Sequence, residues 1–390
     1  MREDLKRQLD RSVPEDVTLS DAKKRQILKA AQERNGERKP SRVPKLLPAL
    51  AGVAVIGLAG ILGSPYVSDW QEQGGAVKEK NLEESLQKVV LPVNDNPELI
   101  NAVFHNDNGV LVYQEDRKIY SYDVETKEEA VLTEVPEGTL IRDVAVEGEW
   151  LVWTEVLEAD MENSSGLNVY NLSNDERVSI SDLNAMSPII DGDHLSFLTF
   201  GSGGASYQLL DLKTMEETAV YQSTEGADSM QAFNDGIIVI PDRREEQNVT
   251  KLTVFDANEK EIINEFELPS KTAMNIHLDD NKIYAHLADE NFVSKLVLIE
   301  LETGEMTELD APEFSAFSAH GKYVALSVPE AGAETVKLFE MDGSSLVMLP
   351  TLDNVEERLV KPRFTDGGTL VVNSEGGDAG LYLLDVGTTD

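Results

Sequence analysis

The side chains most able to do chemistry are few in this sequence, and their spacing matches no common catalytic or metal site. There are five histidines and no cysteine, which excludes disulfides, thiolate zinc sites and Cys nucleophiles. His277 and His286 stand on opposite arms of one expected hairpin, but a pair without a third ligand is weak for metal. Asp191-Gly192-Asp193 lacks the other ligands of a calcium loop, and Gly201-Ser202-Gly203-Gly204 lies between strands rather than before a helix. We predict no catalytic residues, no metal ligands and no cofactor.

Charge is divided unevenly along the chain. The sequence has 34 Lys and Arg against 72 Asp and Glu, a formal net charge of −38. Residues 1–45 hold 13 of the basic and 8 of the acidic residues, a local net of +5, which leaves 21 basic and 64 acidic residues and a net of −43 after Lys45. So acidic a chain is a poor match for nucleic acid, whose phosphates demand clustered Lys and Arg. We predict no nucleic-acid partner.

The sign of the charge changes at residues 46–68, which are 23 residues without a charged side chain. About 20 apolar residues are enough to cross a bilayer as a helix. Four basic residues from Arg38 to Lys45 precede the stretch, and the next basic residue is Lys78. This asymmetry predicts a single-pass transmembrane helix in the cell membrane, with the N-terminus in the cytoplasm and the C-terminal domain extracytoplasmic. A signal peptide cleaved near Leu58-Ala59-Gly60 is the alternative, although the 45 residues before the apolar stretch are long for one.

The cytoplasmic residues 1–45 are expected to be basic and helical. Thr18-Leu19-Ser20-Asp21 offers a helix cap, strong helix formers follow it, and Gly36 and Pro40 end the helix. An apolar stripe on this helix would contact a cytoplasmic protein partner; its candidate residues are Leu19, Ala22, Ile27 and Leu28. The alternative is a solvated tail held by anionic lipid, in which the segment only sets the topology.

After a connector at residues 69–87, a tight turn followed by an apolar strand recurs about every 40–45 residues. Turn dipeptides such as Asp-Gly supply the positive φ that two-residue hairpins need. A second recurring element is an apolar strand that ends in an acid or amide. The seven turns begin at Asn108-Gly109, Glu147-Gly148-Glu149, Asp191-Gly192-Asp193, Asp235-Gly236, Asp280-Asn281, His320-Gly321-Lys322 and Asp366-Gly367-Gly368. Seven copies of about four short strands each are typical of propeller blades.

Ring closure supports the same fold. The last copy ends after its third strand, and residues 88–93 precede the first copy without a partner of their own. Paired with the last blade, this N-terminal strand would close the ring and remove an exposed edge. We therefore predict an all-β, seven-bladed β-propeller at residues 88–390, with six or eight blades if one copy is misread.

The repeats resemble those of TolB-like and related bacterial propellers. The shared pattern is an apolar strand, an acid and a Thr-Gly turn, seen here as Tyr122-Asp123-Val124-Glu125-Thr126, Leu210-Asp211-Leu212-Lys213-Thr214 and Ile299-Glu300-Leu301-Glu302-Thr303-Gly304. The resemblance covers roughly the last three hundred residues and implies a fold, not a ligand. The layout of a short basic helix, one anchor and a large outer domain also resembles membrane-bound anti-sigma factors and sensors of Gram-positive bacteria. There, Thr18-Leu19-Ser20-Asp21 through Gln26-Ile27-Leu28 would correspond to the cytoplasmic contact.

The connections between the second and third strands of each blade vary in length, and they lie on one face of a propeller. We call this the long-loop face, and binding usually resides on such loops. Its acidic residues would attract cations or a basic protein partner outside the membrane, whereas the plainer interpretation is that they maintain solubility. The candidate residues are Glu115, Asp116, Glu155, Glu158, Asp160, Glu162, Asp289, Glu290, Glu330, Glu334, Glu375 and Asp378, with Arg243 and Arg244 as exceptions.

Together these features predict a membrane-anchored, non-catalytic propeller that binds or senses a ligand or protein partner and transmits to a cytoplasmic regulator. Two alternatives remain open. One is an envelope hydrolase or lyase, which would need convergent carboxylates or His in the central funnel. The other is a plain assembly scaffold.

Overall fold

The computed structural model describes residues 82–93, 103–105, 109–160, 165–180, 184–201, 204–223, 229–244, 249–270, 272–288, 293–330, 333–375 and 380–387. The chain divides into two units, Met1–Ala76 and Val77–Asp390, and every described residue belongs to the second. The predicted cytoplasmic segment and anchor therefore lie outside the described residues. Within those residues, no helix has the length and apolar character needed to cross a bilayer.

Seven antiparallel sheets of four strands make up the described unit. The first three sheets consist of β2 (Val103–His105), β3 (Val110–Glu115), β4 (Lys118–Asp123) and β5 (Glu129–Glu134); β6 (Thr139–Glu147), β7 (Trp150–Leu157), β8 (Ser165–Asn171) and β9 (Arg177–Ile180); and β10 (Ala185–Asp191), β11 (His194–Gly201), β12 (Gly204–Asp211) and β13 (Glu217–Gln222). The next two consist of β14 (Ala232–Asn234), β15 (Ile237–Arg244), β16 (Val249–Asp256) and β17 (Glu261–Glu267); and β18 (Thr272–Asp279), β19 (Lys282–Ala288), β20 (Ser294–Glu300) and β21 (Met306–Leu309). The sixth consists of β22 (Ala316–His320), β23 (Tyr323–Glu330), β24 (Ala333–Asp342) and β25 (Ser345–Leu349), and the seventh of β26 (Arg358–Phe364), β27 (Thr369–Glu375), β28 (Gly380–Asp385) and β1 (Leu86–Val90). Two short helices, α3 (Leu82–Ser85) and η2 (Pro350–Leu352), flank the seventh sheet.

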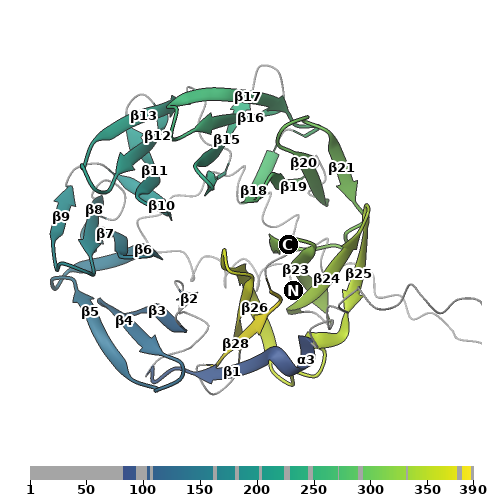
Figure 1. Ribbon diagram of the computed structural model, residues 1–390, viewed down its shortest axis with the longest axis horizontal. Helices are drawn as coiled ribbons and strands as arrows, with labels where there is room; N and C mark the ends of the chain where they lie inside the picture. Colours follow the sequence, from purple (N-terminus) through teal and green to yellow (C-terminus); the bar gives the residue numbers. More distant parts are fainter. Residues whose placement is uncertain are drawn as a thin grey trace, which may run out of the picture. The chain divides into compact units, whose positions relative to one another are not determined.

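The sheets stand around a common axis as seven blades, which confirms the predicted propeller (Figure 1). The first strand of each blade lies nearest the axis. The described residues form seven hydrophobic clusters, and each joins two neighbouring blades. The second and third strands carry the core because their residues are covered on both faces by adjacent blades; five consecutive residues of β7, from Trp150 to Thr154, are buried.

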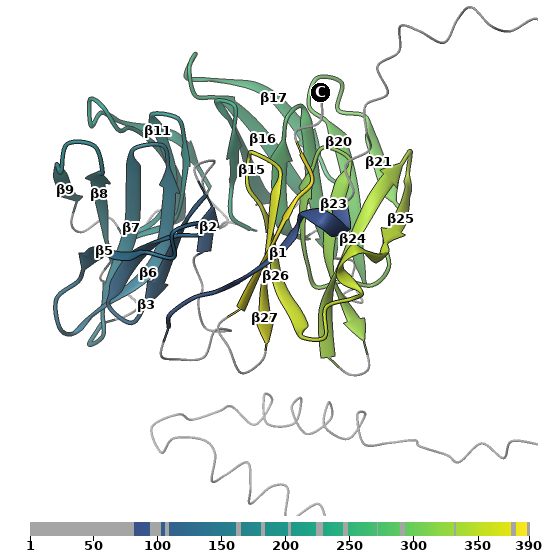
Figure 2. The same cartoon turned by 60° about the horizontal axis from the view of Figure 1, so that its bottom comes forward.

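The N-terminal strand β1 closes the ring, as predicted. It pairs antiparallel with β28, from Leu86 opposite Leu384 to Val90 opposite Gly380, and Figure 2 shows it crossing beside the yellow strands of the last blade. The strand begins at Leu86 rather than Lys88 because Leu86 packs against the cluster between the sixth and seventh blades. Lys88 reinforces the pairing through an ion pair with Glu357, which also accepts a hydrogen bond of 2.7 Å from the Tyr382 hydroxyl.

Two local features of the backbone determine how the first strands present their side chains to the axis of the ring. At the predicted turn Asp235-Gly236, φ is +50° and +73°, so the dipeptide adopts the left-handed backbone that a tight hairpin needs. The first strands β6, β10, β18 and β26 each contain a register shift in their pairing with the second strand. Such bulges re-aim side chains. They therefore determine which residues of the first strands face the axis.

Candidate functional site

The predicted acidic residues of the long-loop face occupy the ends of second strands and the starts of third strands. Glu115, Glu330 and Glu375 end β3, β23 and β27; Glu155 lies in β7 and Glu334 in β24. Asp116, Glu158 and Asp160 lie in the connections that follow, and all three are exposed. Four further candidates of the long-loop face lie outside the described residues: Glu162, Asp289, Glu290 and Asp378. The four candidates for the cytoplasmic contact also lie outside them: Leu19, Ala22, Ile27 and Leu28.

Three of these acids form ion pairs or hydrogen bonds with other side chains of the propeller. Glu375 forms an ion pair with Arg358, and Glu330 lies 3.5 Å from the Lys337 ammonium. The Glu334 carboxylate accepts a hydrogen bond of 2.6 Å from the Ser315 hydroxyl. The sixth and seventh blades thus partly neutralise their own acids. The prediction of an acidic partner face remains untested.

A cavity of about 680 Å³ runs along the axis of the ring and is lined by the first strands. Apolar side chains alternate there with polar ones. Its charged lining residues are Glu147, Asp191, Asp366 and Arg363, and His277 lies among them. A concave cavity in which a few polar groups converge among apolar side chains is the usual form of a ligand site.

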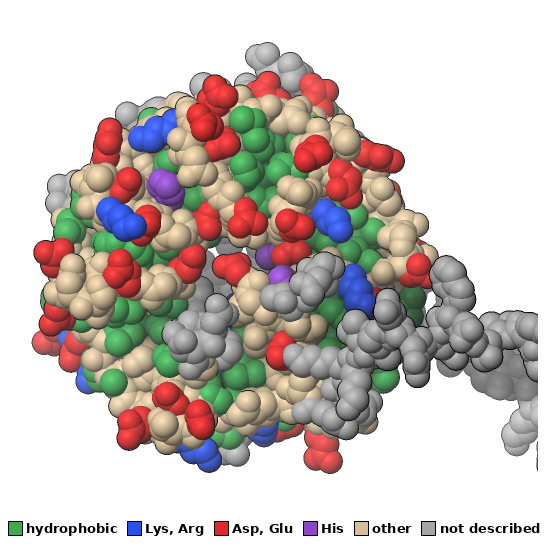
Figure 3. Space-filling model, viewed as in Figure 1, with side chains coloured by type: hydrophobic (Ala, Val, Ile, Leu, Met, Phe, Trp, Pro, Cys, Tyr) green, Lys and Arg blue, Asp and Glu red, His purple; other side chains and the backbone are tan. Residues whose placement is uncertain are grey.

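Five carboxylates gather at the end of this cavity where the first strands turn into the second strands. We call Glu147, Asp191, Asp235, Asp279 and Asp366 the acidic mouth. Figure 3 shows acidic side chains bordering the central opening, with histidine beside them. Burial, followed by the nearby charges of Asp366 and Asp191, raises the pKa of Glu147 to about 7. Burial and neighbouring carboxylates likewise raise the pKa values of Asp235 and Asp366.

Three of the mouth carboxylates also tie one blade to the next. Glu147 accepts a hydrogen bond of 2.9 Å from the Gly192 amide. The carboxylate of Asp191 accepts from the Gly236 amide in the same way, and Asp279 accepts from the Gly321 amide at 2.6 Å. Each acid ends a first strand, and each amide belongs to the turn of the following blade. The repeated acid therefore has a structural role as well as an electrostatic one.

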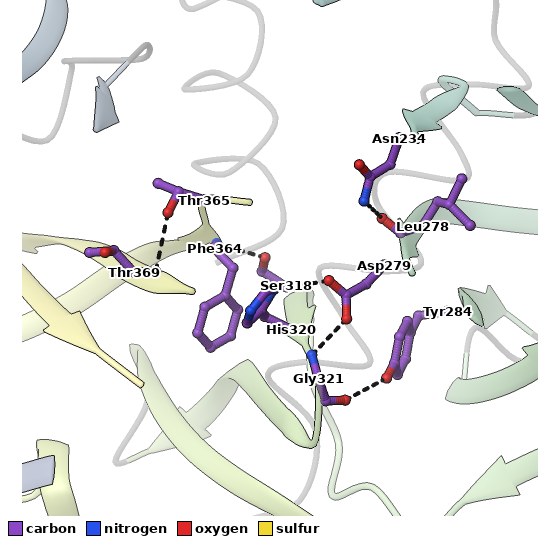
Figure 4. A network of polar contacts seen from close by, with 10 residues as sticks. All are labelled: Asn234, Leu278, Asp279, Tyr284, Ser318, His320, Gly321, Phe364, Thr365 and Thr369. Atoms are coloured by element: carbon purple, nitrogen blue, oxygen red, sulfur yellow. Dashed lines mark hydrogen bonds and ion pairs between the residues drawn. The ribbon is translucent and has the colours of Figure 1, made fainter. Parts of the chain in front are cut away.

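The contact between the fifth and sixth blades is the most elaborate of these links (Figure 4). The buried His320 donates from Nδ1 to Asp279 Oδ1 at 2.9 Å. The Tyr284 hydroxyl donates to the Gly321 carbonyl at 3.1 Å. Burial opposes ionisation of Asp279, but the hydrogen bonds from His320 and Gly321 outweigh it and hold its pKa below the ordinary range. The same hydrogen bond raises the pKa of His320, against burial. Below the raised pKa of His320 the two side chains form an ion pair that links the two blades, and we call this pair the charged clasp.

Glu147→Gln is expected to stabilise the protein at pH 8 and leave its stability unchanged at pH 4. Because the pKa of Glu147 rises from 4.5 to about 7 in the fold, its ionisation costs stability as the pH climbs between those values. A glutamine keeps an acceptor for Gly192 and removes the charge. We expect a gain of about 1–2 kcal/mol at pH 8 after solvent screening, measured by denaturant unfolding at both pH values. The exposed neighbour Glu149→Gln is the control and should change little; equal gains in both variants would contradict the assignment.

Arg363 is a positively charged residue in the lining of the cavity, and its guanidinium is buried. It follows the β26 bulge, in which Lys361 has φ +55°. Its Nη2 donates to Asn373 Oδ1 at 2.6 Å, whereas its Nε is buried without a hydrogen-bond partner. Burial lowers the pKa of the guanidinium to about 10. An anion that enters the cavity would offset the free-energy cost of burying this cation.

The two histidines of the β18–β19 hairpin do not form a joint site. Asn275 rather than His277 lies opposite His286 in the ladder. His286 Nε2 is 2.9 Å from the Ser294 hydroxyl and its ring lies 4.4 Å from that of Phe314, while His277 lines the cavity. Burial lowers the pKa of both. Among the described residues, no group of three or more His, Asp or Glu is placed to hold a metal ion.

Sequence reasoning missed the acidic mouth and Arg363. Glu147 and Asp191 begin two of the predicted turns and Asp279 directly precedes a third, so the recurring acid was a usable signal. Closing seven blades into a ring necessarily brings the first turns together around the axis. Arg363 gave no such signal, because the bulge that re-aims it is a tertiary feature.

Comparison with known proteins identifies the fold. The propeller domain of the Trilobed protease from Pyrococcus furiosus, which has an open velcro topology, is 18% identical, with a TM-score of 0.51 over 64% of this chain and 82% of that one. A chain of the Mitotic Checkpoint Complex is 13% identical, with a TM-score of 0.53 over 77% of this chain and 93% of that one. U3-55K is 12% identical, with a TM-score of 0.53 over 76% and 98% of the two chains. No family model and no curated protein matches the sequence. At these identities the likeness shows a β-propeller and nothing of its ligand.

Proposed function

We propose that this chain is a single-pass membrane protein whose propeller lies on the extracytoplasmic side and binds or senses a ligand or protein partner without catalysis. The observation that carries the proposal is the axial cavity of about 680 Å³, whose lining combines apolar side chains with polar ones and a few charged groups. The 23 uncharged residues at 46–68, with basic residues on their N-terminal side, support the anchor and its orientation.

Signal transfer would use the two ends of the anchor. On the cytoplasmic side, the stripe of Leu19, Ala22, Ile27 and Leu28 would contact a regulator, in the manner of an anti-sigma factor. On the other side, the chain leaving the anchor leads into β1, the strand that closes the ring. A partner of basic character would dock on the acidic long-loop face.

The topology and the signalling role are tested together in intact cells. Protease added outside should remove the propeller and leave residues 1–45 protected. Deleting Met1 to Gly36 while keeping Arg38 to Lys45 should preserve surface display and abolish the regulatory output, read as the transcript changes that follow loss of the full chain. A protected propeller would contradict the topology. Full regulation after the deletion would reduce the segment to a topogenic signal and support the scaffold alternative.

One observation favours an enzyme as the second candidate. Carboxylates do converge in the funnel, and Glu147, whose pKa burial raises to about 7, suits a general acid with a second carboxylate, Asp191, nearby. Against this, both acids hold the turn amides of the next blade. Release of fragments from cell-wall polymers by the full-length protein, and its loss in Glu147→Gln, would contradict the non-catalytic proposal.

A further inference from the structure

We infer that the axial cavity binds a short peptide in extended form, with its C-terminal carboxylate at Arg363 and its N-terminal ammonium at the acidic mouth. The inference rests on the proposed binding function and gives it a ligand class. It is independent of the membrane anchor and of the long-loop face. Three observations carry it: a cation in the cavity that has no ion-pair partner among the described residues, carboxylates at the opening of the cavity, and a buried amide between blades that lacks one hydrogen-bond partner in the same part of the chain.

The first observation is the guanidinium of Arg363. Within the part of the chain that the structure describes, its Nε is buried without a partner, and its Nη2 donates a hydrogen bond of 2.6 Å to the neutral side chain of Asn373. A planar guanidinium with free N–H groups is suited to a carboxylate, which it binds in two parallel hydrogen bonds. In the cavity such a bond would form away from bulk water, where charge-assisted hydrogen bonds are strongest.

The second observation is the charge of the opposite sign at the mouth. Glu147, Asp191 and Asp366 line the same cavity as Arg363. Burial raises the pKa values of Glu147 and Asp366, and the nearby charge of Asp191 adds to both shifts. A bound ammonium group would relieve this repulsion and favour the ionised carboxylates. The cavity is therefore polarised along its axis, from acidic at the mouth to basic inside.

The spacing of these charges selects the size of the ligand. Phe364 lies opposite Leu370 next to the turn that carries Asp366, and Asn373, which holds the guanidinium, lies three residues further along β27. At ~3.3 Å per residue this separates the guanidinium from the turn by about 10 Å. An extended tripeptide places its terminal ammonium and carboxylate about 10 Å apart.

The third observation points to a ligand with N–H groups between its ends. Gln231 lines the cavity and is 2% exposed. Its Nε2 donates to the Ser187 carbonyl at 3.0 Å, which fixes the orientation of the amide, and its Oε1 has no hydrogen-bond partner. A peptide N–H would satisfy this acceptor. An unsatisfied buried acceptor is costly, so Gln231 favours a peptide over a simple amino acid.

The test uses trialanine, N-acetyl-trialanine and trialanine amide, titrated by calorimetry into the full-length protein in detergent. Trialanine is expected to bind about tenfold or more tightly than either blocked form, since each blocked form loses a charge-assisted contact. In Arg363→Gln, trialanine and its amide should bind equally. In Asp366→Asn, the preference for the free ammonium should shrink. Arg117→Gln, an exposed arginine on the first blade, should leave all three affinities unchanged.

Several outcomes would overturn the inference. The inference is wrong if the folded full-length protein shows no saturable binding of trialanine. It is also wrong if trialanine amide or N-acetyl-trialanine binds as tightly as trialanine. If Arg363→Gln does not fold, Arg363→Lys replaces it, because lysine keeps the charge and should keep the preference for a free carboxylate. The comparison of the three peptides is made with the unaltered protein and needs no variant. Failure of these titrations would remove the peptide site only. The proposed function fails separately, when the propeller is protected from external protease.

Discussion

Leu91→Ala is expected to lower the free energy of unfolding by about 2–5 kcal/mol, the cost of truncating a buried leucine. Leu91 is 2% exposed and follows β1 into the cluster between the last and first blades. Its neighbours there include Leu111 and Tyr113 of the first blade and Leu383 of the last. The lost contacts therefore belong to both ends of the ring at once.

This interface is more vulnerable than the other six for a topological reason. Consecutive blades are joined covalently by the chain. The last blade is joined to the first because β1, which precedes the first blade in the sequence, pairs with β28 and packs its side chains there. A cavity at Leu91 weakens the element that prevents the ring from opening. We expect denaturant unfolding, followed by the fluorescence of the buried Trp150 and Trp153, to report the loss.

Val90→Ala provides the matched control for the closing strand. Val90 is the last residue of β1 but is 48% exposed, so its truncation should change the unfolding free energy by no more than about 0.5 kcal/mol. Equal effects of Val90→Ala and Leu91→Ala would show that β1 contributes through its backbone pairing alone. A negligible effect of Leu91→Ala would contradict closure by side-chain packing.

The sequence was sufficient for the architecture because a propeller repeats its local signals. Turn dipeptides such as Asp235-Gly236 mark where the first strand ends, and the orphaned residues 88–93 indicated the closing strand. The exact start of β1 at Leu86 could not be read in this way. It depends on packing against residues of the sixth and seventh blades that lie far along the chain.

The candidate site was less accessible to sequence reasoning because it arises from ring closure and from bulges. Loop length directed attention to Glu330 and Glu375, which the fold pairs with Lys337 and Arg358. The local sequence around the mouth acids indicates only hairpin turns, and in the fold Asp191 and Asp279 end first strands and accept hydrogen bonds from the turn amides of the next blade. That these acids also surround one opening follows only from the placement of several blades about an axis.

Asp279→Asn is expected to cost about 3–5 kcal/mol of unfolding free energy near pH 5.5, the usual effect of breaking a buried ion pair by removing one partner. Asp279 and His320 are 8% and 9% exposed, and their hydrogen bond of 2.9 Å joins the fifth blade to the sixth. The variant preserves the volume of the side chain and an acceptor for the Gly321 amide. It leaves the protonated His320 without its carboxylate, beside the ring of Phe364 at a centroid distance of 6.0 Å.

The pH dependence of this loss separates charge from shape. Asp279 has a pKa below the ordinary 3.8, so its contribution is complete above that value and is lost as the pH falls through the lowered pKa. His320 has a pKa above the ordinary 6.5, so its contribution is complete below 6.5 and is lost as the pH rises through the raised pKa. The penalty of Asp279→Asn should therefore be largest between these values and smaller in alkaline solution, as measured by denaturant unfolding across the pH range. Asp280→Asn, at the exposed neighbouring position with φ +54°, should change stability by no more than about 0.5 kcal/mol. A penalty for Asp279→Asn that is the same at every pH would mean that packing, rather than the charged clasp, holds the two blades together.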